Sequence, residues 1–154
     1  MALRTILEHP DPQLKKISKP VIDFDNRLHL LLDDLIETMQ NSNGVGLAAP
    51  QVGILRRVVV IEVDGKIYEL INPAIVSSSG KQRTEEGCLS CPNIFGYTVR
   101  PSKVTVKAQD RHGKVYKVKG TELLAKALCH EIDHLNGILF LDNVVEYIDI
   151  ENIK

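Results

Sequence analysis

The most regular apolar pattern in the chain lies between residues 25 and 41. Apolar side chains recur there every three or four positions, at Leu28, Leu31, Leu32, Leu35, Ile36 and Met39. This spacing places them on one face of a helix. Asp25 stands where an N-cap side chain accepts backbone hydrogen bonds, and the Asn-Ser-Asn-Gly run at 41–44 interrupts the pattern. We therefore expect an amphipathic helix over residues 25–41.

A second helical pattern covers residues 121–136. Its apolar side chains occupy much of the circumference, at Leu123, Leu124, Ala127, Leu128, Ile132 and Leu135. A helix that is apolar on most sides is usually buried. Thr121 is the expected N-cap, and Gly137 is expected to end the helix.

The rest of the chain alternates apolar and polar residues with the period of two that is typical of strands. Asp64-Gly65 and the run 110–113 have the composition of hairpin turns. We expect strands at 57–63, 66–71, 103–109 and 115–119, a further strand and a turn near 77–80 within 73–87, and a short strand within 138–146. This pattern predicts an α+β fold, in which short, mostly antiparallel strands surround the buried second helix.

The chain has 154 residues, a length that suits one domain over residues 1–154. Residues 1–20 contain three prolines and are expected to form an irregular arm packed on that domain. Hydrophobic residues make up 44% and charged residues 25%, as in globular proteins that fold without a metal or a crosslink. The 19 basic and 20 acidic side chains, with no tryptophan, disfavour a nucleic-acid-binding protein.

The chain carries no apolar run long enough to predict a membrane span. Its first residues lack the apolar core of a secretory signal, so we expect a cytoplasmic protein. In such a reducing compartment the three cysteines are expected to be thiols, ligands or small apolar side chains rather than disulfides.

The strongest chemical signal is the His-Glu-Ile-Asp-His run at 130–134. On a helix, His130 and His134 lie one turn apart on the same face and can reach one metal ion. Glu131 is then placed to act as a general base in metal-assisted hydrolysis. The alternative is a pair of exposed helix histidines, but a buried pair needs a partner that a metal would supply.

A catalytic site of this kind needs a third protein ligand and an open position. Phe140 stands where one metalloprotease class has a third histidine, and it cannot bind a metal. Glu146 and Glu151 are candidates of another class, but both are expected to be solvated. The better candidate is Cys88, in the Glu-Gly-Cys-Leu-Ser run, because a thiolate binds transition metals well.

The two other cysteines, Cys91 and Cys129, are expected to be buried apolar side chains. Cys88 and Cys91 form a Cys-x-x-Cys pair, but the thioredoxin-type interpretation requires a βαβ context that the sequence lacks.

The loop at 44–53 contains a Gly-x-Gly-x-x-Ala sequence that resembles a dinucleotide-binding motif. We reject that interpretation, because the loop follows a helix and runs into Pro50 rather than opening a helix. Its glycines would let the backbone approach a ligand closely. Gln51 has an amide that could donate to an oxyanion, although spacing alone favours an ordinary loop glutamine.

Together, three segments of the chain resemble the peptide deformylase family. Residues 44–51, 86–90 and 130–134 match that family's motifs Gly-x-Gly-x-Ala-Ala-x-Gln, Glu-Gly-Cys-x-Ser and His-Glu-x-x-His at every fixed position. The resemblance implies hydrolysis of the formyl group from the N-terminal formyl-methionine of nascent polypeptides, releasing formate. It also implies one divalent metal ion, with Fe²⁺ expected and Zn²⁺, Ni²⁺ or Co²⁺ as alternatives.

The resemblance also assigns roles. Cys88, His130 and His134 would hold the metal, and Glu131 would move the proton from the attacking water to the leaving nitrogen. The Gln51 side chain and the Leu89 backbone N–H would stabilise the oxyanion. The Gly46 backbone would align the substrate, and Val45, Leu123, Ala127 and Cys129 are candidates for the methionine pocket. We further expect an ion pair between Glu86 and Arg100 that braces the Cys88 loop.

Two departures from the family pattern qualify the resemblance. Cys91 stands where the family usually has a branched apolar residue, which adds a second thiol near the site. The tail after Leu141 is short and contains no basic helix, so docking on the ribosome by a C-terminal helix is not expected. We expect a bacterial, monomeric enzyme that acts on nascent chains, with transient ribosome association and without direct binding to nucleic acid or membrane.

Three alternatives remain at this point. A metallopeptidase that cuts internal bonds is disfavoured by Phe140. A silent peptide-binding domain of the same fold would have no need of Glu131, Gln51 and Cys88 together. A structural zinc site would fill four positions with protein ligands, and only three credible ones are present.

Overall fold

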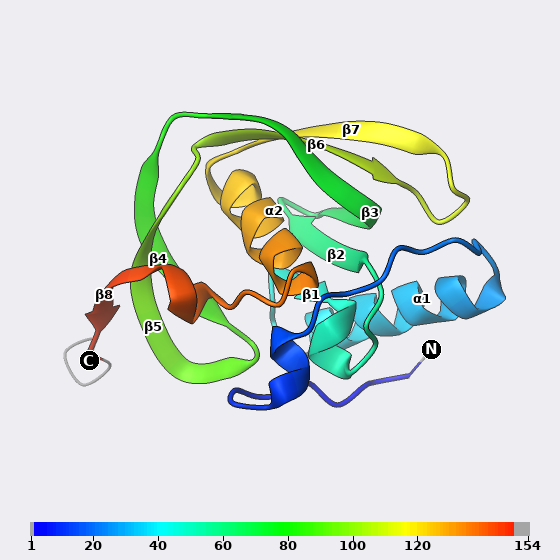
Figure 1. The fold of residues 1–154 in the computed structure, drawn as a ribbon, viewed down its shortest axis with the longest axis horizontal. Helices are drawn as coiled ribbons and strands as arrows, with labels where there is room; N and C mark the ends of the chain where they lie inside the picture. Colours follow the sequence, from blue (N-terminus) through cyan, green and yellow to red (C-terminus); the bar gives the residue numbers. More distant parts are fainter. Residues whose placement is uncertain (1, 150–154) are drawn as a thin grey trace.

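The fold consists of two antiparallel sheets arranged around one central helix (Figure 1). The structure, a computed structural model, describes residues 2–149. Its five-stranded sheet has the order β1-β2-β3-β6-β7 and its three-stranded sheet the order β4-β5-β8. The strands are β1 (Gly46–Ala48), β2 (Val58–Val63), β3 (Lys66–Ser79), β4 (Gln82–Cys88), β5 (Cys91–Arg100), β6 (Lys103–Gln109), β7 (Val115–Thr121) and β8 (Val144–Ile148).

Two α-helices lie in the described residues, α1 (Asn26–Asn41) and α2 (Glu122–Leu135). Three short 3-10 helices accompany them: η1 (Pro12–Lys15), η2 (Ala49–Val52) and η3 (Phe140–Asn143). Every strand pair within the two sheets is antiparallel, which confirms the α+β prediction. Within residues 2–149, no helix is long and apolar enough to cross a membrane.

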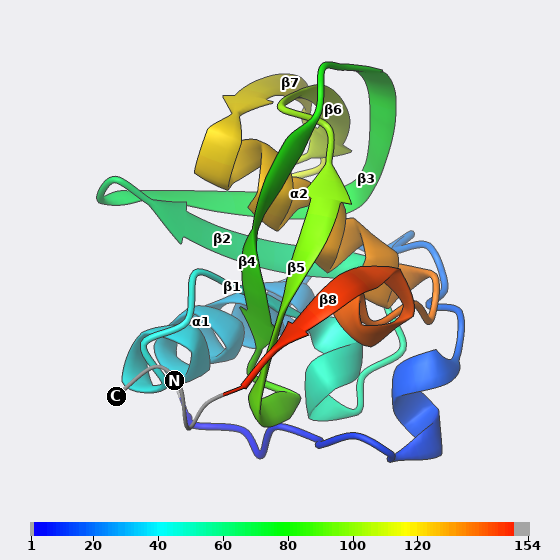
Figure 2. The same ribbon diagram turned by 90° about the vertical axis from the view of Figure 1, so that its left-hand side faces the viewer.

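α2 covers one face of the five-stranded sheet, whereas α1 covers the other face only at β1 and β2. Successive residues of a strand point to opposite faces, so the uninterrupted apolar run of β2 serves both sides. Val59 and Ile61 pack in the cluster that includes α2, whereas Val58 and Val60 pack in the cluster that includes α1. α2 also contacts β5 and so lies between the two sheets (Figure 2). This position buries the face that carries the two histidines.

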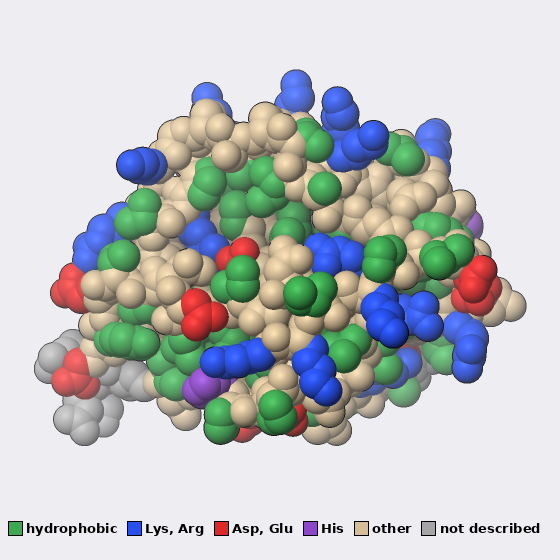
Figure 3. Space-filling view, viewed as in Figure 1, with side chains coloured by type: hydrophobic (Ala, Val, Ile, Leu, Met, Phe, Trp, Pro, Cys, Tyr) green, Lys and Arg blue, Asp and Glu red, His purple; other side chains and the backbone are tan. Residues whose placement is uncertain are grey.

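The outer part of the larger sheet shows a simple alternation. Val104, Val106 and Ala108 of β6 are buried, as their spacing predicted. The intervening positions of β6 and β7 carry exposed lysines, and Lys107 is the register partner of Lys117. Figure 3 shows the resulting row of basic side chains along the upper edge of the molecule. These lysine side chains face solvent on the part of the sheet, at β6 and β7, that α1 does not cover.

The predicted helices are confirmed to within a residue or two. Asp25 caps α1 by accepting a hydrogen bond of 3.1 Å from the Leu28 N–H. Thr121 occupies the N-cap position of α2 but its side chain makes no capping bond, so that part of the prediction was wrong. Gly137 follows α2 with a φ of 73°, the left-handed conformation that glycine accepts without strain.

The strand predictions were less complete. β3 extends through Ser79 and β4 begins at Gln82, so the turn lies at 80–81, at the end of the predicted range 77–80. β3 and β5 have 14 and 10 residues, so they are not short, and β5 was not predicted. Residues 138–146 contain η3 followed by the start of β8 rather than one strand. The loop expected at 44–53 contains β1 and η2.

The N-terminal arm is fixed to the larger sheet through Asn72, which lies at a register shift in β3. The Asn72 side chain accepts a hydrogen bond of 2.8 Å from the Val21 N–H. It donates bonds of 2.9 Å to the Val21 carbonyl and to Gln109 Oε1. Its φ of 53° is a left-handed conformation, which asparagine adopts more readily than most residues.

Asn72→Ala is expected to lower the free energy of unfolding by about 2–4 kcal/mol, because three hydrogen bonds are lost and their partners lie in a partly buried site. Urea denaturation followed by circular dichroism measures this change. Asn93→Ala is the control, because Asn93 also has a left-handed φ of 63° but is exposed. Equal losses for the two variants would mean that backbone strain, and not the Val21 contacts, accounts for the effect.

Candidate active site

Three potential metal ligands converge at the buried face of α2. His130 and His134 lie one turn apart on the helix, and Cys88 ends β4. The two Nε2 atoms are 3.2 Å apart, and Cys88 Sγ is 3.3 Å from His134 Nε2. The three ligand atoms all lie within 4.8 Å of one another. The sequence therefore brings together the predicted set from two distant segments.

The donor atoms fit one divalent cation. Ligands bound at 2.0–2.3 Å around a tetrahedral ion lie roughly 3.3–3.7 Å apart, close to the distances seen here. Both histidines are buried, and each directs Nε2 at the other. A proton between the two imidazole nitrogens would leave Cys88 Sγ without a share in it, whereas one cation accepts the lone pairs of both nitrogens and of the sulfur. A thiol and two imidazoles suit the transition metals rather than Mg²⁺ or Ca²⁺.

A carboxylate behind the site fixes the His130 ring. Glu86 Oε2 lies 2.6 Å from His130 Nδ1, so Nδ1–H donates to the carboxylate and Nε2 keeps its lone pair for a metal. Thr98 donates a bond of 2.7 Å to Glu86 Oε1. Every side-chain contact of this carboxylate therefore holds it in the orientation that His130 requires.

The predicted ion pair between Glu86 and Arg100 is confirmed. Arg100 donates from Nη2 to Glu86 Oε2 at 2.7 Å and from Nε to Oε1 at 3.1 Å. Its Nη1 reaches Asp133 on α2 at 2.7 Å. Burial opposes the charge on Glu86, but hydrogen bonds from His130 and Arg100 prevail and hold the pKa of Glu86 well below its usual range. Arg100 thus ties the strand that carries Cys88 to the helix that carries the histidines.

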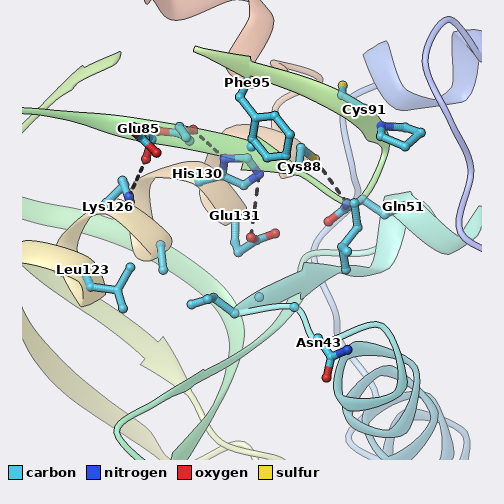
Figure 4. Close-up of a pocket in the computed structure, with 18 of the residues that line it drawn as sticks. Asn43, Gln51, Glu85, Cys88, Cys91, Phe95, Leu123, Lys126, His130 and Glu131 are labelled. Carbon is cyan, nitrogen blue, oxygen red and sulfur yellow. Dashed lines mark hydrogen bonds and ion pairs between the residues drawn. The ribbon is translucent and has the colours of Figure 1, made fainter. Parts of the chain in front are cut away.

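Glu131 is buried beside the candidate metal ligands. Its Oε2 is 3.8 Å from His130 Nε2, and its Oε1 has no hydrogen-bond partner among the described residues. Burial raises the pKa of Glu131 to about 7, although His130 opposes this shift. A carboxylate with that pKa can take up and release a proton near neutral pH. Figure 4 shows it directed into the cavity below His130.

Gln51 is buried next to Cys88, and its amide is oriented by two contacts. The Ala48 N–H donates to Gln51 Oε1 at 2.9 Å, so the amide nitrogen must face the site. That Nε2 donates to Ser90 Oγ at 3.1 Å and lies 3.6 Å from Cys88 Sγ. This placement argues against an ordinary loop glutamine, which would be solvated.

A cavity of about 470 Å³ opens in front of these side chains. Val45, Gly46, Leu89, Leu123 and Ala127, all expected in substrate or oxyanion binding, lie on its wall. Cys129 does not; it packs in the core between α2 and the larger sheet, so it is not a pocket residue. The wall combines apolar side chains with a few polar groups, as is typical of ligand sites.

Gly46 allows a close approach between β1 and Glu131. A Cβ atom at position 46 would lie 2.6 Å from Glu131 Oε2. We expect Gly46→Ala to displace this carboxylate and to lower kcat about 100-fold, since a shift of about 1 Å in a reacting group has that effect. The control is Gly65→Ala, in a hairpin turn with nothing within 4 Å; its left-handed φ of 76° makes alanine costly for stability there, but kcat should be unchanged. Unchanged turnover in Gly46→Ala would show that Glu131 can move without loss.

Some parts of the site were not predicted from the sequence. Ser90 orients Gln51, Thr98 holds Glu86, and Phe95 and Lys126 line the cavity. Thr98 and Phe95 belong to β5, the strand that was missed, so no pattern pointed to them. Ser90 belongs to a recognised motif, and that was the available signal.

The alternative third ligands lie elsewhere. Glu146 is on exposed β8 and pairs with Arg83. Glu151 lies outside the described residues. Phe140 is buried, and its ring stacks on the His130 ring with centroids 6.2 Å apart. Three converging ligands, a buried carboxylate beside them and an open cavity are typical of metal-dependent hydrolases.

The comparisons with known proteins agree with this class. Residues 3–148 match the polypeptide deformylase family, and the chain belongs to that family. The peptide deformylase of Alkaliphilus metalliredigens is 55% identical over 146 residues, which cover 95% of this chain and 99% of that protein.

Solved structures give the same result. The crystal structure of a peptide deformylase from Legionella pneumophila superimposes with a TM-score of 0.91 at 50% identity, covering 93% of this chain and 86% of that one. The peptide deformylase from Thermotoga maritima has a TM-score of 0.91 at 39% identity, covering 94% and 99%.

Proposed function

We propose that Cys88, His130 and His134 hold one divalent cation and that Glu131 is the general base of a formamide hydrolase. The reaction is that of the family: hydrolysis of the N-formyl group from the N-terminal formyl-methionine of nascent polypeptides, releasing formate. The observation that carries the assignment of residues is the convergence of one thiol and two imidazoles beside a buried carboxylate. The single catalytic domain would comprise residues 1–154.

A divalent cation in this position supplies Lewis acidity, which lowers the pKa of water and polarises a carbonyl group. The side chains do the rest. Glu131 takes the proton of the attacking water and passes it to the leaving amide nitrogen. Gln51 Nε2 and the Leu89 backbone N–H donate to the oxygen of the formyl group as negative charge develops there. Glu86 and Arg100 keep His130 in its ligating orientation.

The cavity wall explains how a formyl-methionine would be held. Val45 and Leu123 are partly exposed at the cavity and, with Ala127, offer apolar contacts to an unbranched thioether side chain. The Gly46 backbone can align an extended peptide, because it belongs to β1, the edge strand of the larger sheet. A formyl group is the smallest acyl group, which suits a reacting centre enclosed by Glu131 and Gln51.

The finer assignments follow from the same site. Fe²⁺ is the expected ion, and Zn²⁺, Ni²⁺ or Co²⁺ suit the same ligands. We infer a monomeric enzyme of the bacterial cytoplasm that meets nascent chains at the ribosome only transiently. Residues 150–154, the end of the C-terminal tail, lie outside the described residues.

The test of the reaction is a substrate panel. Protein purified without oxygen and reconstituted with Fe²⁺ or Ni²⁺ is incubated with formyl-Met-Ala-Ser, acetyl-Met-Ala-Ser and an unformylated longer peptide. Formate and free Met-Ala-Ser are expected from the first substrate only. Cleavage inside the unformylated peptide would instead identify a metallopeptidase, and metal-loaded protein that binds but does not turn over formyl-Met-Ala-Ser would be a peptide-binding domain.

A further inference from the structure

Cys91 is a buried thiol next to the proposed metal ligand Cys88, and the proposed reaction does not use it. The two cysteines flank a two-residue turn and are register partners at the end of the β4–β5 hairpin. Directly opposed residues of antiparallel strands have Cα atoms about 4.5–5.5 Å apart. That separation lies within the roughly 4.4–6.8 Å range that a disulfide requires. Partners in register also project their side chains to the same face of the sheet.

The two cysteines also share one environment in the folded protein. Cys91 packs in the small core cluster that Cys88 borders. Both residues line the cavity in front of the candidate metal ligands (Figure 4). A register shift lies next to Gly87, between Glu86 and Cys88.

We propose that Cys91 is a resolving thiol: when a peroxide oxidises Cys88, Cys91 captures it as a Cys88–Cys91 disulfide and the metal is released reversibly. This inference rests on the proposed role of Cys88 as a metal ligand. Cys129 cannot take the same part, because it is buried in the core between α2 and the larger sheet.

The chemistry balances with hydrogen peroxide as the oxidant. The Cys88 sulfur attacks the O–O bond and becomes a sulfenic acid, and one water molecule leaves. The Cys91 sulfur then attacks the Cys88 sulfur, the S–S bond forms and a second water molecule is expelled. The two thiols lose two electrons and two protons in total. The Cys88 sulfur is then no longer a thiolate, so the cation loses one of its three protein ligands.

Without Cys91, oxidation of Cys88 is expected to give a different final product. A sulfenic acid that no thiol captures proceeds to sulfinic and sulfonic acids, which thiol reductants do not reverse. The disulfide, in contrast, is restored to two thiols by a dithiol reductant. Cys91 would therefore convert permanent damage to the metal site into reversible inactivation.

The test follows thiols and metal, and it does not use turnover. Ni²⁺-loaded wild type is treated with hydrogen peroxide, alkylated and digested with trypsin, and the released metal is measured with a coloured chelator. Cys88 and Cys91 fall in one tryptic peptide, 84–103, because Arg100 precedes a proline, whereas Cys129 falls in peptide 127–154. The expected product is peptide 84–103 lighter by two hydrogen atoms and protected from alkylation, with loss of the metal and rebinding after dithiothreitol.

Two variants complete the test. Cys91→Ala is expected to yield Cys88 heavier by two or three oxygen atoms, without recovery of metal binding by dithiothreitol. Cys129→Ala should form the same crosslink as wild type. The proposal is overturned if wild-type Cys88 gains oxygen atoms to the same extent as in Cys91→Ala, or if the crosslink forms while the metal stays bound. Because no readout depends on deformylation, failure of the proposed reaction would be seen separately.

Discussion

Glu131→Gln is expected to lower kcat for formyl-Met-Ala-Ser by about 10²–10⁴-fold, the usual contribution of a general base. Gln has nearly the same shape as Glu but cannot accept the proton of the attacking water. Glu131 is 4% exposed, and the neighbouring carboxylate Glu86 is held by Arg100 and His130, so it is not free to replace Glu131. Steady-state kinetics with a formate assay measures the loss.

The same variant separates catalysis from metal binding. Cys88, His130 and His134 are unchanged, so Glu131→Gln should bind one divalent ion per chain as wild type does. A drop in kcat together with full metal content is the expected result. If kcat stays within about threefold of wild type, Glu131 is not the base, since a general base contributes far more. If the metal is lost, Glu131 acts in building the site rather than in the reaction.

Arg100→Leu is expected to have the largest effect on stability. Arg100 and Glu86 are both buried, with side chains 7% and 3% exposed. Removing one partner leaves an uncompensated buried charge, which costs about 3–5 kcal/mol of the free energy of unfolding. Glu86 would also lose its orientation toward His130, and loss of such support weakens metal binding by about 10–100-fold. Denaturant unfolding of metal-free protein and competition with a chelator measure the two effects.

Arg83→Leu is the matched control for Arg100→Leu. Arg83 lies on β4 and pairs with Glu146, but its side chain is half exposed. An exposed ion pair contributes at most about 1 kcal/mol, and this one does not contact the metal ligands. Arg100→Lys should recover part of the stability but less of the metal affinity, because lysine cannot make the paired contacts of the guanidinium. Equal effects of Arg83→Leu and Arg100→Leu would contradict the bracing role.

The periodicity of apolar residues predicted the helices and strands that bury one regular face. The spacing of Leu28, Leu32 and Leu35 predicted α1, and the alternation around Val106 predicted β6. The strand β5 was missed because its residues, from Cys91 to Arg100, alternate poorly and are distributed among the cavity, the core and solvent. Such a strand exists because two neighbours pair with it, and sequence periodicity does not register that pairing.

The residues of the candidate site also differ in how far the sequence could predict them. His130 and His134 were predictable together because four residues make one helical turn. Cys88 could be named as a candidate third ligand from the chemistry of its thiolate, but its spatial meeting with the histidines could not be read from local patterns, since β4 and α2 meet through tertiary packing. The ion pair of Glu86 and Arg100 was anticipated as a brace of the Cys88 loop, but the contact of Glu86 with His130 was not. Its contact with His130 depends on the register of β4 with β5, which the sequence does not specify.

The central claim is that one cation, held by Cys88, His130 and His134, is required for deformylation. The most direct measurement is a metal titration: metal-free protein receives increasing Ni²⁺ without oxygen, and bound metal and formate release from formyl-Met-Ala-Ser are determined in the same samples. The account predicts that activity rises in proportion to bound metal and levels off at one ion per chain. Formate release by demonstrably metal-free protein, or none at one bound ion per chain, would contradict it.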